Sequence, residues 1–445
     1  MKLPLPLLLS LSCASTTTMD RPAIDAAVTD GAVAADAAPA VSTCSRGHAV
    51  DLLFVIDNQG QMASHGQLTL LRGFRSFLDA LAPPTAPATS LRIGVISTDL
   101  GTPGSTVPSC ANSDVGDDAR LNPIRYGQAM GSHPPWTTDH AVVRPARCAP
   151  DFAQYPSFLT FDAASADRDG FREDFFCYGF LSGRGGCGLE QPLEAAYRAL
   201  VLHDARETPG NQSPNAGFVR ADAVLAVVVL TDDDDGSVRD CRYATPGAPC
   251  TDATSVFDST NASWADASLT GRFYLYTPGS PQDPTWNLDR YFDPARPSQG
   301  LTAVKPGAPQ MVVFGAIAGV PMSTPQHADG TLDWDALLGT RTDGSDGYVG
   351  MSPEGPVSMR QRNPDPDCSA RVVPSCRREG SDYDPADPPC GSDRQSYAFP
   401  SRRVAQVVRR FDERYQNGVL GSICRNDYED TLRAVARRVT EHFCP

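Results

Sequence analysis

Four continuous apolar runs constrain the fold of this chain more than any other feature. They read "DLLFVID" (51–57), "LRIGVIS" (91–97), "AVLAVVVLT" (223–231) and "MVVFGAIAG" (311–319). None alternates between apolar and polar residues, and β-branched side chains are frequent in all four. Strands that are covered on both faces by helices, as in a parallel sheet, have this composition. The runs therefore predict the core strands of a buried sheet.

Helical patterns lie between and after these runs. The apolar spacing of an amphipathic helix recurs over residues 66–82, 189–203, 401–415 and 426–443. In the last two segments the basic residues are predicted to lie on the outer face of the helix. Strands that alternate with helices indicate an α/β fold. We therefore predict a doubly wound, mostly parallel sheet that is flanked by helices.

Long segments without a clear period separate these elements. Residues 102–185, 233–310 and 320–399 are dense in Pro, Gly, Asp and Cys, and the 445-residue chain holds 37 Gly and 39 Pro. We interpret them as insertions into one domain over residues 44–445. Unstructured loops of that length are rare in compact domains, so each insertion is expected to carry small elements.

The N-terminus has the pattern of an export signal. Residues 1–12 combine Lys2 with a short apolar stretch and small residues, and about 20 apolar residues would be needed to span a bilayer. The segment ending in Cys13 resembles a bacterial lipobox, which implies lipidation of Cys13. The alternative is an ordinary cleaved signal with an incidental cysteine. Residues 13–43, rich in Ala, Asp, Thr and Pro, predict a disordered tether.

The cysteine count also indicates export. Without Cys13, 12 of the 13 cysteines remain, an even number that favours disulfides in an oxidising compartment. Local bridges Cys177–Cys187, Cys241–Cys250 and Cys424–Cys444 are plausible, although spacing alone leaves the connectivity open. We expect an exported protein that is lipid-anchored at the outer membrane or the cell surface.

Charge and missing motifs narrow the function. The net charge of −15 disfavours nucleic acid as a partner, because phosphate backbones are repelled. The sequence lacks G-x-S-x-G, H-E-x-x-H and phosphate-loop motifs, and its seven histidines are scattered singly. We therefore expect a protein that is not an enzyme. An exported hydrolase that uses a pair of acids is a remote alternative.

Acidic residues follow three of the predicted strands. Asp57 closes the first run, Asp99 follows the second, and Asp232 opens the run "DDDD" after the third. The carboxyl ends of parallel strands meet at one edge, where gathered carboxylates repel one another unless a cation or donors lie among them. Gln59 and Gln61 alternate with Asp57, so their side chains can turn towards one point.

These residues predict a metal site made of Asp57, Gln59, Gln61 and Asp232. Hard cations such as Mg²⁺, Ca²⁺ or Mn²⁺ take oxygen ligands of this kind. The alternative is that Asp57 and Asp232 cap helix N-termini.

The same stretches resemble a known family. "DLLFVIDNQGQM" and "AVVVLTDDDD" are similar to the first and third loops of a von Willebrand factor type A (vWA) domain. The wider pattern, with "STDLG", "GCGLEQPLEAAYRAL" and "GSICRNDYEDTLRAVARRV", resembles cysteine-rich exported bacterial lipoproteins.

The resemblance implies a metal-ion-dependent adhesion site in which Asp57 and Asp232 match the first-loop and third-loop aspartates. Gln59 and Gln61 replace the two family serines, and "GRGGCGLEQ" offers Glu190 where the family has a threonine. It also implies cell adhesion through recognition of a protein or a glycan. A metal-free vWA scaffold for envelope assembly is the alternative that the glutamines favour.

Overall fold

The structure is a computed structural model. It describes residues 44–45, 47–60, 62–83, 90–107, 110, 112–122, 148, 154–162, 167–180, 183, 186–245, 247–258, 260–261, 272–273, 281, 283–338, 349–352, 355–358, 375–379 and 397–444. The predicted signal and tether, residues 1–43, lie outside this set.

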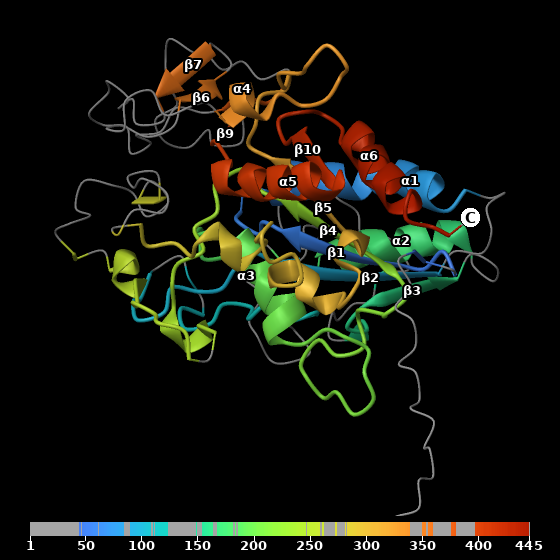
Figure 1. Cartoon of the computed structure of the whole chain (residues 1–445), viewed down its shortest axis with the longest axis horizontal. Coiled ribbons are helices and arrows are strands. Elements are labelled where there is room, and N and C mark those ends of the chain that lie inside the picture. The colour runs from blue at the N-terminus through green and yellow to red at the C-terminus, as the bar shows by residue number, and fades with distance from the viewer. Residues whose placement is uncertain are drawn as a thin grey trace, which may run out of the picture. The chain divides into compact units, whose positions relative to one another are not determined.

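A six-stranded sheet forms the centre of the described part of the chain (Figure 1). Its strand order is β10-β5-β4-β1-β2-β3, with β3 antiparallel to β2 and the other neighbours parallel. The strands are β1 (Val50–Ile56), β2 (Ser90–Ser97), β3 (Leu159–Asp162), β4 (Val224–Leu230), β5 (Val312–Ala318) and β10 (Gly418–Ser422). The prediction of a mostly parallel α/β sheet is therefore confirmed, and β1, β2, β4 and β5 coincide with the four apolar runs.

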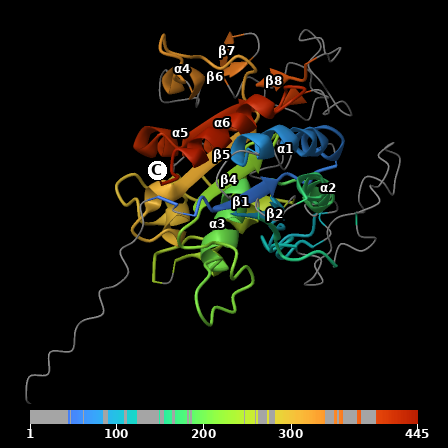
Figure 2. The same ribbon diagram turned by 90° about the vertical axis from the view of Figure 1, so that its right-hand side faces the viewer.

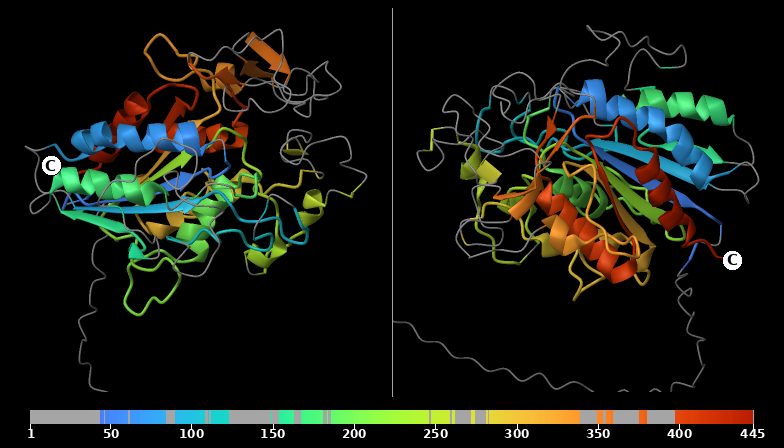
Figure 3. Two further views of the ribbon diagram at one scale, coloured as in Figure 1. Left: turned by 180° about the vertical axis from the view of Figure 1, so that it is seen from behind. Right: turned by 90° about the horizontal axis from the view of Figure 1, so that it is seen from above.

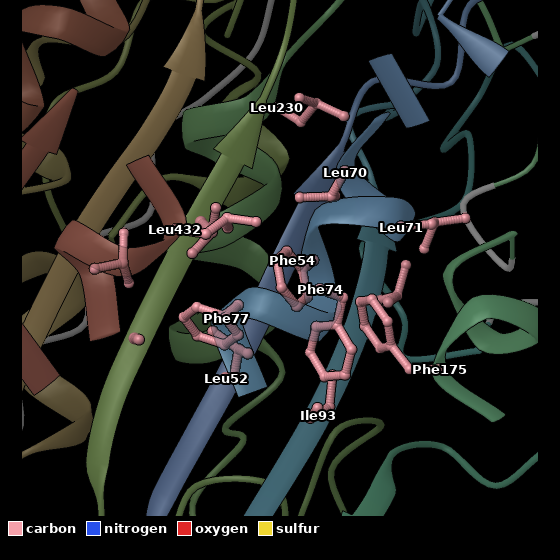
Figure 4. Packing of buried hydrophobic residues seen from close by; sticks show 14 of the residues in the cluster. Leu52, Phe54, Leu70, Leu71, Phe74, Phe77, Ile93, Phe175, Leu230 and Leu432 are labelled. Atoms are coloured by element: carbon pink, nitrogen blue, oxygen red, sulfur yellow. The ribbon is translucent and has the colours of Figure 1, made fainter. Parts of the chain in front are cut away.

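One face of the sheet is covered by α1 (Leu68–Leu81), α2 (Arg168–Gly179) and α6 (Glu429–Thr440). Phe54 of β1 lies among Phe74 of α1 and Phe175 of α2 (Figure 4), and the rings of Phe74 and Phe175 stack 3.6 Å apart. These side chains are buried because the helices present their apolar stripes to the strands.

The opposite face is covered by α3 (Pro192–Tyr197), which continues as the π-helical turn η5 (Arg198–Leu202), and by α5 (Arg402–Tyr415). Helices thus lie on both sides of the strands (Figures 2 and 3). Every residue of β1 is buried, as expected for a strand covered on both faces. None of the described helices combines the length and apolar character needed to cross a bilayer.

Several elements were not predicted. Within the predicted insertion 102–185, β3 extends the sheet edge and α2 packs on α1. The last core strand, β10, reads "GVLGS" and is too short and glycine-rich to stand out as an apolar run. The insertion 320–399 carries α4 (Trp334–Leu338), β6 (Val349–Ser352), β7 (Gly355–Ser358), β8 (Cys376–Arg377) and β9 (Tyr397–Ala398).

Five disulfides join described residues: Cys44–Cys444, Cys110–Cys187, Cys148–Cys177, Cys241–Cys250 and Cys376–Cys424. The local bridge Cys241–Cys250 is confirmed. The bridges Cys177–Cys187 and Cys424–Cys444 are wrong, because the fold brings cysteines from distant segments closer than those sequence neighbours. Cys368 and Cys390 lie outside the described residues.

Candidate functional site

The candidate site lies where the carboxyl ends of β1, β2 and β4 meet at one edge of the sheet. The parallel register pairs Ile56 with Ser97 on one side and with Leu230 on the other. The residue after each strand therefore leaves the sheet at the same level, and the Asp57 backbone N–H donates to the Leu230 carbonyl at 2.9 Å. This register brings Asp57 and Asp232 to one edge although 175 positions separate them in the sequence.

The side chain of Gln59 lies at the point where the acids converge. Its Nε2 is 3.0 Å from Asp232 Oδ1, 3.0 Å from Asp233 Oδ2 and 3.4 Å from Asp57 Oδ2. Its backbone N–H donates to the other oxygen of Asp57 at 3.0 Å. An amide nitrogen carries two hydrogens, so three carboxylates compete for two donors.

Two threonine hydroxyl groups and a fourth acid also belong to the candidate site. The Thr231 hydroxyl donates to Asp57 Oδ2 at 3.2 Å. The Thr98 hydroxyl, after β2, donates to the carboxylate of Glu190. We call Asp57, Glu190, Asp232 and Asp233 the rim acid cluster. Asp57, Glu190 and Asp233 are buried, and Asp232 is the partly exposed member.

Burial and mutual repulsion keep protons on this cluster. Burial raises the pKa of Asp57 to about 6, and the negative charge of Asp233 adds to the increase. Burial, followed by the charge of Asp57, raises the pKa of Glu190 well above its ordinary value. Burial and the charges of Asp57 and Asp233 do the same for the pKa of Asp232. Near neutral pH the cluster therefore requires protons or a cation to offset its charge.

The loop before α3 packs directly on the loop after β1. The Gly186 N–H donates to the Asn58 carbonyl at 3.1 Å. A Cβ atom on Gly186 would clash with the side-chain amide of Asn58, so Asn58 would have to turn away if this position carried a side chain. This loop contact holds the segment before Glu190 beside the segment that follows β1, and Asp57 lies close enough to raise the pKa of Glu190.

The four acids of the "DDDD" run divide into two pairs. Asp232 and Asp233 face Gln59, whereas Asp234 accepts from the Arg403 N–H at 2.8 Å and Asp235 from the Leu193 N–H at 3.0 Å. Helix capping is therefore done by Asp234 and Asp235 at the starts of α5 and α3. Among the described residues, neither Asp57 nor Asp232 accepts a hydrogen bond from a helix N-terminus, so the capping alternative is wrong for these two.

The start of α5 was predicted to carry basic residues on its exposed face, and the structure differs from this prediction. Arg402 and Arg403 are buried. The Arg403 guanidinium lies 3.0 Å from Asp235 Oδ2, and Arg402 lies 3.9 Å from Asp234 Oδ2. These arginines point inward because the capping acids need positive partners.

A second acidic pair follows β2. Asp99 accepts from the N–H groups of Gly101 at 2.8 Å and Cys187 at 3.2 Å, and burial raises its pKa to about 6. Asp117 accepts from the Ser97 hydroxyl at 2.6 Å, and burial, then the charge of Asp99, raises its pKa well above the ordinary value. Asp99 thus anchors the disulfide-linked loop that carries Cys187.

One group of ligand atoms in the described part of the chain is compact enough to hold a metal ion. A carboxylate oxygen of Asp99 and the sulfurs of Cys110 and Cys187 lie within 4.8 Å of one another. The two sulfurs are joined in a disulfide, however, and the thiolate is the form that binds metals. This group could therefore hold an ion only after reduction.

The predicted metal ligands Asp57, Gln59 and Asp232 are brought together by the structure, but Gln59 presents nitrogen to the acids. Gln61 and Cys13, the predicted lipidation residue, lie outside the described residues. Asp233 was not predicted as a ligand, because the sequence does not show which acids of the run face the rim.

Comparisons with protein-family models, with curated proteins and with solved structures gave no match to this chain.

Proposed function

We propose that this protein is an exported recognition domain of the vWA type that binds a divalent cation through the rim acid cluster. The observation that carries the proposal is the convergence of Asp57, Asp232 and Asp233 on one point, with Glu190 beside them. Burial and neighbouring carboxylates are the main causes of the raised pKa values of Asp57, Asp232 and Glu190. A cation would offset this negative charge.

The residue types at the rim suit a hard cation, and its carboxylates would have to move closer together to hold one, because the compact ligand group in the described part is the one at Asp99. Carboxylate, hydroxyl and amide oxygens are the ligands that Mg²⁺, Ca²⁺ and Mn²⁺ prefer. Asp57, Asp232 and Asp233 offer carboxylates, Thr231 a hydroxyl, and Gln59 an oxygen once its amide is turned over. When bound, such an ion offers a coordination position to an acidic group on a protein or a glycan.

The disulfide between Cys44 and Cys444 lies away from the rim acid cluster. The disulfide Cys44–Cys444 lies beside the start of β1, whereas Asp57 follows its end. The seven residues of β1 separate the two by roughly 23 Å. The Cys44–Cys444 bridge therefore lies at the end of β1 opposite the rim acid cluster.

A metal-free scaffold for envelope assembly is the second candidate. The observation that favours it is the Gln59 nitrogen, which already lies among the three carboxylates. In that case the partner would bind with the amide in place, and chelators would have no effect.

Arrays of glycans and of envelope proteins, probed with the mature chain in Mg²⁺ and then in EDTA, separate these candidates. We expect binding that EDTA removes and that Asp57→Ala abolishes. Asp169→Ala is the matched control, because the Asp169 side chain is 86% exposed and pairs with Arg172 in its own helix. Binding that resists EDTA would favour the scaffold, and turnover of an ester, peptide or glycoside would revive the hydrolase.

A further inference from the structure

We propose that the side-chain amide of Gln59 is the resident occupant of the cation position and competes with a cation for the rim acid cluster. This inference rests on the proposed function, because it concerns the same site. It adds the residue that sets the cation affinity of that site.

The contacts of Gln59 are those of a bound cation rather than of an ordinary surface amide. Its Nε2 contacts oxygens of Asp57, Asp232 and Asp233 at 3.0–3.4 Å. Two of these acids come from the loop after β4 and the third from the end of β1, so the nitrogen joins two segments. An ion at this point would have to draw the same three carboxylates closer than they stand around the nitrogen, and the ion and the amide cannot occupy the point together.

The backbone holds Gln59 in this position. Its N–H donates to Asp57 Oδ1 at 3.0 Å, and its carbonyl accepts from the Met62 N–H at 3.0 Å. The residue is only 7% exposed. A buried polar side chain needs hydrogen-bond partners, so leaving the acids would cost free energy unless a ligand replaces it.

The surrounding loop is rich in oxygens and short of donors. Asn58 and Gln67 are each 1% exposed, and Asn58 Oδ1 and Gln67 Oε1 have no hydrogen-bond partner among the described residues. The Gln67 amide nitrogen donates to the Asp57 backbone carbonyl at 2.9 Å and to the Gly183 carbonyl at 3.0 Å. At the rim itself, Gln59 supplies one NH₂ group to three carboxylates, so acceptors outnumber donors there, a shortage that a cation would relieve.

Competition of this kind lowers the apparent affinity for a cation. A site that is open only part of the time binds with an affinity reduced by the open fraction. Replacing Gln59 by Ala removes the competing nitrogen and leaves Asp57, Asp232 and Asp233 facing one another. Replacing it by Ser gives a shorter side chain that offers a hydroxyl oxygen.

The test measures Mn²⁺ binding to the full chain by electron paramagnetic resonance for the wild type, Gln59→Ala, Gln59→Ser and Gln299→Ala. Gln299 is the matched control, because it is exposed and its side chain makes no capping hydrogen bond. We expect Gln59→Ala and Gln59→Ser to bind Mn²⁺ at least about tenfold more tightly than the wild type. Gln299→Ala should bind like the wild type. Circular dichroism establishes whether each variant is folded. If one of the two Gln59 variants does not fold, the other still provides the test.

The outcomes separate this inference from the proposed function. Weak binding by the wild type and tighter binding by the Gln59 variants supports both. Binding by the Gln59 variants alone supports the competition but overturns the proposed cation role of the natural protein. If the Gln59 variants bind as weakly as the wild type or more weakly, Gln59 does not compete and the inference is overturned. Absence of binding in every variant overturns both.

Discussion

At the scale of single residues, the charge of the rim acid cluster is partly offset by neutral side chains, of which Gln59 makes the most contacts. Gln59 gives two N–H groups to three carboxylates, and Thr231 adds one hydroxyl donor. Neutral donors offset a buried charge only in part, so the pKa values of Asp57, Asp232 and Glu190 are raised. Protonation, cation binding and stability are therefore linked at this edge.

The first prediction concerns stability against pH in the absence of divalent cations. Asp57 has a pKa of about 6 in the folded protein, against an ordinary value of 3.8. The folded state binds this proton more tightly than the unfolded state does. Stability from the proton is therefore present at low pH and is lost as pH rises from about 4 to about 6. The loss due to Asp57 is on the order of 2–3 kcal/mol.

Chemical denaturation in EDTA at pH 4.5 and pH 7.5 measures this loss. Asp57→Asn should lose less stability than the wild type over this interval, although Asp99 and Asp234, with pKa values also of about 6, still contribute. Equal losses in the two proteins would show that Asp57 is ionised in the folded state at both pH values.

The sequence predicted part of the site because of strand register. Asp57 and Asp232 each follow a core strand, and parallel strands in register place such residues at one edge. The inward nitrogen of Gln59 could not be predicted, since an amide offers either atom. The separation of the "DDDD" run into rim acids and capping acids depends on where α3 and α5 begin, which only the folded chain determines.

At the scale of secondary structure, buried ion pairs attach the helices to the loop after β4. Arg403 of α5 is 4% exposed and binds Asp235, which is fully buried and also accepts from the Leu193 N–H of α3. Removing one partner of such a pair leaves an uncompensated buried charge.

The second prediction follows from this pair. Arg403→Met should lower the free energy of unfolding by about 3–5 kcal/mol, because Asp235 remains buried without its arginine. Arg409→Met is the control in the same helix, and its exposed pairs with Glu413 and Asp335 should be worth less than about 1 kcal/mol. Urea denaturation of both variants gives the two values. Equal small losses would mean that Asp235 does not depend on Arg403.

The core strands were predictable because burial on both faces gives a continuous apolar run. The amphipathic helices were predictable because burial on one face gives an apolar stripe. The predicted helix over residues 66–82 is found as α1, and the segment 401–415 as α5. Short β10 and antiparallel β3 escaped because their pairing comes from neighbouring strands rather than from their own composition. Arg402 and Arg403 were assigned to an outer face because helical period alone cannot show a buried acid beside them.

At the scale of the whole described domain, one disulfide joins its two ends. Cys44 and Cys444 are 400 positions apart, and the Ser45 N–H donates to the His442 carbonyl at 2.9 Å beside them. The bridge lies beside the start of β1, at the edge opposite the rim acid cluster.

The third prediction is that stability and cation binding separate when this bridge is removed. The double variant Cys44→Ser with Cys444→Ser should lose about 2–5 kcal/mol of unfolding free energy, since closing a long loop restricts the unfolded chain. Its Mn²⁺ affinity should equal that of the wild type. Thermal denaturation and Mn²⁺ titration check the two parts, and a large loss of affinity would show that the two edges of the sheet are coupled.

The most direct test of the account is an anomalous-diffraction map of crystals soaked in Mn²⁺. We predict a peak bounded by Asp57, Asp232 and Asp233, with the Gln59 nitrogen displaced from its present position. A map at saturating Mn²⁺ with no peak there, and with Gln59 still bonded to all three carboxylates, would contradict the claim that this rim is a cation site.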